Sequence, residues 1–134
     1  MKIKIATIFL IAIVIAASCS DMEHKKPIPD DAFPIVYRSH LYVQGEADSC
    51  KGNFVFDTGA SGLYFDTTFY CSNNFNYSNI VDAKIPGAGT SLQDIIVIRD
   101  TVGFSFGTDY YQTVFVPVLK LKPILGDFAD GILG

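Results

Sequence analysis

The chain has few of the residues that hold metal ions. Its 134 residues include two histidines and three cysteines. His24 and His40 are distant in sequence, and neither stands at a metal-ligand spacing from a pair of cysteines. This composition argues against a zinc site. We expect no metal and no other cofactor.

Basic residues are also few. Lys and Arg number 10 against 14 Asp and Glu, for a formal net charge of −4. The basic residues are scattered and form no stripe, so nothing favours binding to nucleic acid. The acidic balance mainly favours solubility.

The N-terminus carries an apolar run that is short for a membrane span. Residues 5–17 are apolar except for Thr7, and Lys2 and Lys4 precede them. A helix that crosses a bilayer needs roughly 20 apolar residues. We therefore interpret residues 1–18 as a signal peptide for export.

Cys19 suggests a lipoprotein signal. The stretch from Ile15 to Cys19 (Ile-Ala-Ala-Ser-Cys) resembles a bacterial lipobox. The resemblance implies that Cys19 becomes the acylated first residue and binds the lipid bilayer, each buried methylene adding ~0.8 kcal/mol. An ordinary signal peptide is the alternative. Residues 19–32 are polar, contain two prolines and are interpreted as a tether.

The same signal predicts an exported protein anchored in the cell envelope, on its periplasmic or surface face. Ser20 after the cysteine favours the outer membrane over the inner one. Removal of residues 1–18 leaves eight basic and fourteen acidic residues. Cys50 and Cys71 then remain as an even pair, for which a disulfide and two free thiols are both open.

From residue 33 onwards the sequence predicts short strands. Residues 35–43 alternate with period two, interrupted at Ser39, and a polar turn over residues 45–52 follows. Asp66 is a candidate cap for one helical turn over residues 67–71. Further strands are expected at residues 53–56, 63–65, 80–85, 92–99, 102–106 and 110–119, with turns at 86–89 and 107–109. The pattern predicts one all-β domain, a barrel or sandwich, over residues 33–134.

The candidate site follows one of these strands. Residues 54–56 are apolar and lead into Asp57, Thr58 and Gly59. The strand would deliver the carboxylate of Asp57 at the mouth of the core, and Gly59 would permit a tight turn. On its own, however, Asp-Thr-Gly is equally the composition of an ordinary β-turn.

The surroundings of this motif resemble the pepsin and retropepsin clan of aspartic peptidases. In that clan a hydrophobic-hydrophobic-Asp-Thr-Gly loop is followed, within the same lobe, by a hydrophobic-hydrophobic-Gly strand, and the two cross as a ψ-shaped loop. Residues 57–59 match the first element and Ile132-Leu133-Gly134 the second, preceded by Asp130-Gly131. The resemblance covers residues 35–134 and implies a single lobe of the acid-protease β-barrel, with residues 80–99 as its flap.

The resemblance also implies roles for the site residues. Asp57 would be the catalytic aspartate, Thr58 would interlock with a partner lobe, and Gly59 would keep the backbone close to the carboxylate. Ala60 stands where pepsin-like enzymes often have a hydroxyl donor, and alanine is typical of retropepsins. One donor fewer to the ionised form favours activity at milder acidity. Residues 80–99 lack the tyrosine that such flaps use to clamp substrate.

The implied reaction is water-mediated hydrolysis of a peptide or protein by two aspartates that share one proton. The sequence contains one Asp-Thr-Gly, and neither Asp127 nor Asp130 is followed by Thr-Gly or Ser-Gly. Three hypotheses remain open: a homodimer, one lobe of a longer enzyme of which this chain is a C-terminally incomplete (truncated) part, and an inactive lipid-anchored binding or vestigial protein. Asp130-Gly131 and a strand that reaches the last residue favour the second, so we expect the isolated chain to be inactive.

Overall fold

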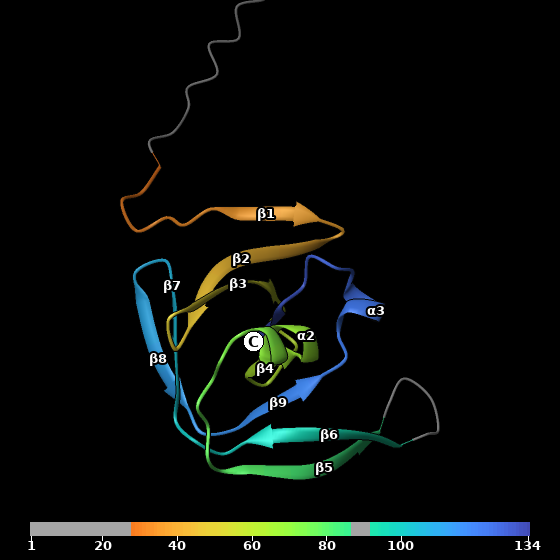
Figure 1. Cartoon of the computed structure of the whole chain (residues 1–134). Helices are drawn as coiled ribbons and strands as arrows, with labels where there is room; N and C mark the ends of the chain where they lie inside the picture. Colours follow the sequence, from red (N-terminus) through yellow and green to blue (C-terminus); the bar gives the residue numbers. More distant parts are fainter. Residues whose placement is uncertain (1–27, 87–91) are drawn as a thin grey trace, which may run out of the picture.

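A computed structural model describes residues 28–86 and 92–134, which form one curled sheet with two short helices (Figure 1). The predicted signal peptide, the predicted lipid attachment at Cys19 and most of the predicted tether lie outside the described residues. In the described part, no helix is long and apolar enough to cross a membrane. The strands are β1 (Ile35–Arg38), β2 (His40–Ala47), β3 (Cys50–Phe56), β4 (Leu63–Asp66), β5 (Ile80–Pro86), β6 (Leu92–Ile98), β7 (Val102–Phe106), β8 (Asp109–Thr113), β9 (Val116–Leu119) and β10 (Gly131–Leu133).

The sheet has the strand order β5-β6-β9-β4-β10-β3-β2-β7-β8, and β1 pairs with β2 beside β7. Neighbouring strands curl so that the sheet forms an open half-barrel around the core (Figure 1). The helices are α2 (Thr67–Ser72) and α3 (Lys122–Leu125). The prediction of an all-β lobe is therefore confirmed. The β5–β6 pair forms the expected hairpin, whose tip at residues 87–91 is outside the described residues.

Two sequence predictions at the start of the sheet are wrong. Residues 35–43 are two antiparallel strands, because Ser39 adopts a positive φ of 65° and reverses the chain between β1 and β2. The turn expected over residues 45–52 is shorter, since β2 and β3 pair as far as Ala47 and Cys50. Only Asp48 and Ser49 turn, with φ of 42° and 71°, which suits a two-residue hairpin turn.

The single strand expected at residues 110–119 is also wrong, because the chain leaves the edge of the sheet at β8 and enters its interior between β6 and β4. β8 pairs with β7, whereas β9 pairs with β6 and β4. Val116 and Val118 are buried by this change of partners, while Val114 and Phe115 at the break stay exposed. The sequence pattern predicted strand structure over these residues but not the break between β8 and β9.

The helical turn at residues 67–71 is confirmed as α2. Asp66 caps it, with Oδ1 accepting from the Thr68 N–H at 2.7 Å. An acceptor at this position satisfies a donor that has no partner within the helix. Helix α3 was not predicted.

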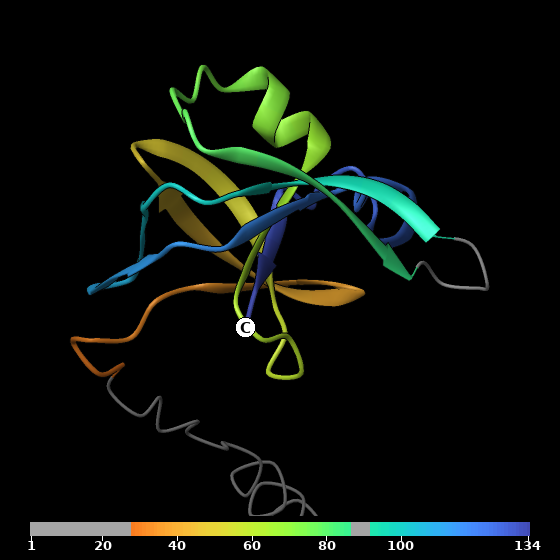
Figure 2. The same cartoon turned by 90° about the horizontal axis from the view of Figure 1, so that it is seen from below.

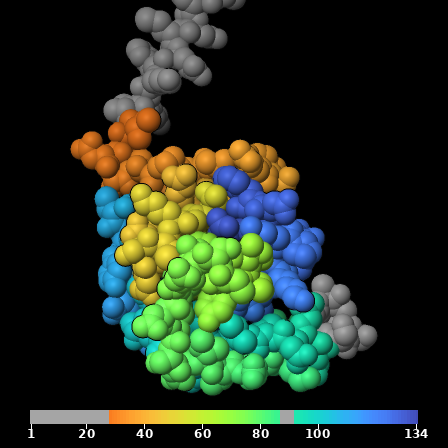
Figure 3. Space-filling view, viewed as in Figure 1, coloured from red at the N-terminus to blue at the C-terminus, as the bar shows by residue number. Residues whose placement is uncertain are grey.

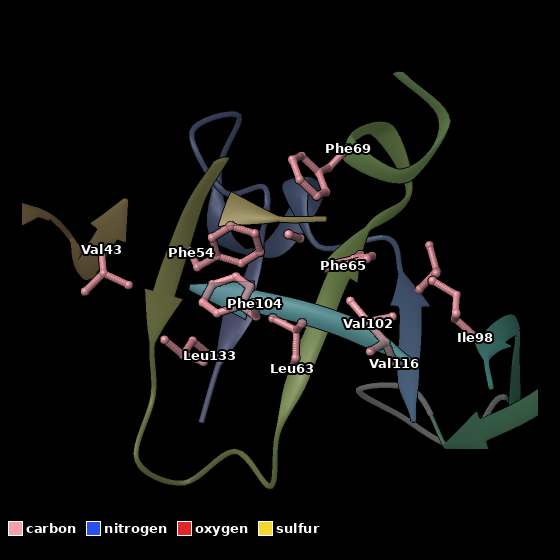
Figure 4. Packing of buried hydrophobic residues seen from close by; sticks show 12 residues of the cluster. Val43, Phe54, Leu63, Phe65, Phe69, Ile98, Val102, Phe104, Val116 and Leu133 are labelled. Carbon is pink, nitrogen blue, oxygen red and sulfur yellow. The ribbon is translucent and has the colours of Figure 1, made fainter. Parts of the chain in front are cut away.

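The main core is aromatic and lies inside the curl. Phe54 is fully buried and meets the ring of Phe104 edge to face, with centroids 4.7 Å apart. Figure 4 shows both rings between β3 and β4. Phe69 of α2 approaches Phe54 at 5.6 Å, so the helix closes one end of this core. Burial of each such side chain stabilises the fold by about 1.5–3 kcal/mol.

A second, smaller cluster covers the other face of β3. Its buried members are Tyr42, Val55 and Ala129, against which Phe128, Leu125 of α3 and Ile132 of β10 pack. Tyr42 and Phe128 meet edge to face at 5.0 Å. The centre of the sheet is thus covered on both faces.

Candidate active site

The C-terminal strand lies between the two strands that flank the Asp-Thr-Gly loop. β10 runs parallel to β3, with Leu133 opposite Phe56, and antiparallel to β4, with Leu133 opposite Leu63. A strand that enters between two earlier strands joined by a loop makes the ψ-shaped crossing that the resemblance implied. Figure 2 shows the loop of residues 57–62 beside the C-terminal end of the chain, and α2 at the opposite end of the lobe.

Backbone hydrogen bonds fix the loop to β10. The Asp57 N–H donates to the Leu133 carbonyl at 2.9 Å, so β3 and β10 continue to pair at the aspartate. The Gly134 N–H donates to the Gly62 carbonyl at 3.1 Å on the far side of the loop. Within the loop, the Ala60 N–H donates to the Asp57 carbonyl at 3.0 Å and closes the turn. The crossing therefore determines where Asp57 stands.

The carboxylate of Asp57 is held by the glycine two residues later. Oδ1 accepts from the Gly59 N–H at 2.9 Å. A Cβ at Gly59 would stand 3.2 Å from this oxygen, closer than ordinary contact. The tight turn expected at Gly59 is present, but Gly59 has no positive φ, so a left-handed backbone is not the reason for glycine here. The glycine instead allows the backbone to approach the carboxylate.

Asp57, Thr58 and Gly59 are all exposed in the single chain. Asp57 therefore lies at an accessible edge of the lobe, open to a group from another lobe or subunit. The contact of Thr58 with a partner stays a prediction.

Two hydroxyls at the end of the loop form a pair that the sequence did not predict. Ser61 Oγ and Tyr64 OH are 3.0 Å apart and share a hydrogen bond. Tyr64 belongs to β4, opposite Ile132 of β10, so the bond ties the end of the loop to the strand that follows it. Only the three-residue separation could have suggested the pair, and such a spacing is common between unrelated hydroxyls.

Asp130 has a structural role in this lobe. Its Oδ2 accepts from the Asn53 N–H at 2.9 Å, and its own N–H donates to the Asn53 carbonyl at 2.8 Å. Oδ1 lies 3.8 Å from Lys122 Nζ. Asp130 thus positions the start of β10, as expected of an acid that lacks a following Thr-Gly or Ser-Gly.

The possible disulfide is not formed. Cys50 and Cys71 are free cysteines and line different hollows of the lobe. Burial, followed by the negative charges of Asp48 and Glu46, raises the pKa of the Cys50 thiol above its ordinary value.

Cys71 lies on α2 at a hollow that β6 and α3 also line. Figure 3 views this side, with α2 in front, the blue C-terminal residues beside it and the β5–β6 hairpin below.

Among the described residues, no group of three or more His, Cys, Asp and Glu side chains is arranged to hold a metal ion. His40 is half-buried and lies edge to face with Tyr42, their centroids 6.3 Å apart.

No protein-family model matches the chain, and no curated protein matches it. Among solved structures, the chain is similar to a retropepsin-like aspartic protease from Rickettsia conorii. The two are 20% identical, the match covers 75% of this chain and 71% of that chain, and the TM-score is 0.48.

Proposed function

We propose that this chain contributes one half of an aspartic-type endopeptidase site, with Asp57 as one of the two catalytic carboxylates. The observation that carries the proposal is the position of Asp57 at the crossing of β3, β10 and the loop of residues 57–62. The crossing holds an exposed carboxylate on a backbone tied to two neighbouring strands. A catalytic group needs such a fixed position to act on a bound substrate.

The reaction requires a second carboxylate close to the first. Two carboxylates a few ångströms apart cannot both ionise easily, so they share one proton and titrate as a pair. The ionised member takes a proton from a water molecule, which attacks the peptide carbonyl carbon, while the protonated member donates to the carbonyl oxygen. Gly59 assists by donating its N–H to Asp57 Oδ1, which holds the carboxylate in place.

The second aspartate comes from outside the 134 residues, either from a second copy of this chain or from a further lobe of the same protein. The sequence holds a single Asp-Thr-Gly, and the accessibility of Asp57 leaves its carboxylate open to a facing group. Solution mass separates a dimer from a monomer. The coding DNA beyond Gly134 shows whether a second Asp-Thr-Gly or Asp-Ser-Gly follows.

The test is cleavage of casein or a peptide library between about pH 4 and 7, the acidic range in which an aspartate pair shares a proton. Asp57→Asn retains the shape of the side chain and should abolish cleavage. Asp127→Asn is the matched control and should cleave like the wild type. Activity that survives in Asp57→Asn, or is unaffected by pepstatin, would exclude the aspartic mechanism.

An inactive binding protein is the second candidate, and the single Asp-Thr-Gly favours it. Such a protein would bind peptides on the same face without hydrolysing them. The Asp57→Ala variant of such a protein would still bind the peptide. The wild type would cleave no peptide at any pH or with any partner in a way that Asp57→Ala abolishes.

Cys19 anchors the protein by lipid to the cell envelope, preferentially at the outer membrane. The lipobox-like residues from Ile15 to Cys19 and the basic start of the signal support this part of the proposal. Cys19→Ala should move the protein from the membrane fraction to the soluble fraction, and mass spectrometry of the N-terminal peptide should lose the acyl mass. An unmodified Cys19 in the mature wild type would exclude the lipid anchor.

A further inference from the structure

The buried carboxylate of Asp66 joins three parts of the lobe. Asp66 is 1% exposed at the end of β4. Its Oδ1 accepts from the Thr68 N–H in α2, and its Oδ2 accepts from the N–H groups of Leu121 at 2.9 Å and Lys122 at 3.1 Å. A carboxylate at this depth is stable only when its oxygens are hydrogen-bonded. The three donors meet that requirement.

Asp66 also binds the far end of the segment that begins at Leu121. Its backbone N–H donates to the Asp130 carbonyl at 2.8 Å. One residue therefore fixes both ends of residues 121–130, which we call the strap. Lys122 and Asp130 reinforce this closure weakly, since their charged atoms are 3.8 Å apart.

The strap lies on the face of the sheet from which Asp57 emerges. Asp57 follows Val55 by two residues and continues the pairing of β3 with β10, so the two side chains share a face. Val55 packs in the small cluster with Ala129 and Phe128 of the strap. The hydroxyl of Tyr42 donates to the Leu125 carbonyl at 3.0 Å and fixes the middle of the strap on that face.

We propose that Asp66 is a positioning residue of the Asp57 site, which holds the strap as a wall beside the path of a bound peptide. Asp66 touches no reacting atom. It acts by keeping residues 121–130 against the Val55 face, so that the wall is formed before a substrate arrives. The effect on peptide binding rests on the proposed function, whereas the effect on the strap does not.

The first measurement is amide hydrogen exchange of the full chain at neutral pH. Asp66→Asn keeps the size of the side chain but replaces one carboxylate oxygen by an NH2 group. Because that NH2 group faces backbone N–H donors, the hydrogen bonds of the replaced oxygen are lost. We expect exchange of the strap amides to rise at least tenfold, with the strands β2, β3 and β7 unchanged. Lys122→Met is the matched control, because it keeps the backbone N–H and loses only the charge, and its strap should exchange within about threefold of the wild type.

Two exchange results would overturn the proposal: unchanged strap protection in Asp66→Asn, or an equal loss over every strand. The second result would mean that Asp66 supports the whole lobe and not the strap.

The second measurement is cleavage kinetics of the complete enzyme, with whichever second aspartate it uses. Asp66→Asn should raise KM about tenfold and change kcat less than threefold, while Asp57→Asn should abolish turnover and leave strap exchange unchanged. A fall in kcat at constant KM would overturn the wall role. Activity that survives in Asp57→Asn would reject the proposed function and leave the exchange result for Asp66 standing.

Discussion

Gly131 of β10 faces the backbone carbonyl oxygen of Tyr64 in β4, with no room between them for a side chain. A Cβ at position 131 would collide with that oxygen and would stand 2.7 Å from the ring of Phe54. Both neighbours belong to strands that flank β10, and one of them is backbone that pairs in the sheet. The glycine ahead of Ile132 is therefore a packing requirement of the crossing that positions Asp57.

Gly131→Ala should destabilise the lobe by about 1–3 kcal/mol, because an added methyl in a closely packed site forces its neighbours to move. Urea unfolding measures the change. Gly62→Ala is the matched control, since a Cβ there meets nothing within 4 Å, and surface substitutions that disturb no packing usually change stability by less than about 0.5 kcal/mol. Equal midpoints and slopes for the two variants would contradict the packing explanation.

Phe54 is the aromatic residue on which the main core centres. Phe54→Ala should reduce the free energy of unfolding by about 3–5 kcal/mol, the range for a buried phenylalanine replaced by alanine. Phe115→Ala removes the same atoms from a side chain that is 54% exposed and should have a small effect. If thermal or urea unfolding gives the two variants equal free energies of unfolding, the core is not organised around Phe54.

The all-β fold class, the positions of most strands and the Asp57 motif could be predicted from the sequence, because they depend on residues that are neighbours along the chain. Alternation revealed most strands, and the capping role of Asp66 followed from the residues next to it. The sequence shows an interruption of the alternation at Ser39, but it did not reveal the chain reversal there, because a non-glycine residue rarely adopts a positive φ.

Contacts between distant segments explain the other misses. Leu121 and Lys122 bind Asp66 across 55 and 56 positions, and no spacing rule connects them. The break between β8 and β9 was missed because it depends on which strands are free to pair. At the site, the resemblance indicated both the crossing and the close approach of Gly59 to the carboxylate, and the structure adds the hydrogen bond from the Gly59 N–H to Asp57 Oδ1.

Tyr77 and Tyr111 have different hydroxyl environments. The Tyr77 hydroxyl donates to Asp48 Oδ2 at 2.7 Å, whereas the buried Tyr111 hydroxyl has no hydrogen-bond partner within the described ranges. Tyr77→Phe should destabilise the lobe by about 1–2 kcal/mol, while Tyr111→Phe should be neutral or stabilise it by up to about 1 kcal/mol. Urea unfolding at pH 7 compares them. A larger loss in Tyr111→Phe would mean that its hydroxyl is bonded in solution.

Tyr111 should also ionise late in an alkaline titration. Burial raises the pKa of Tyr111 to about 12. Because this folded value lies above the unfolded one of about 10, the contribution to stability is present below pH 10 and is lost as the pH rises towards 12. Difference absorbance of wild type and Tyr111→Phe isolates the phenol. Ionisation of Tyr111 near pH 10 in the folded chain would contradict its burial.

Asp66 should make the lobe sensitive to acid. Burial alone would raise the pKa of its carboxyl, but the N–H groups of Thr68, Leu121 and Lys122 outweigh burial and hold the pKa below the ordinary value of 3.8. The charged groups near it on the packed segments are Lys122 and Asp130, and these bind each other only weakly. Because the folded pKa is lower than the unfolded one, the stabilisation by Asp66 is complete above the unfolded value.

This stabilisation is lost as the pH falls from about 3.8 through the lower folded pKa, where the carboxylate takes up a proton. Asp66→Asn lacks that proton equilibrium, so its free energy of unfolding should fall less steeply over this window than that of the wild type. Urea unfolding at steps from pH 7 to pH 2 measures both curves. Asp94→Asn, on the exposed side of β6, is the control and should follow the wild type. Parallel curves for the wild type and Asp66→Asn would show that folding does not lower the pKa of Asp66.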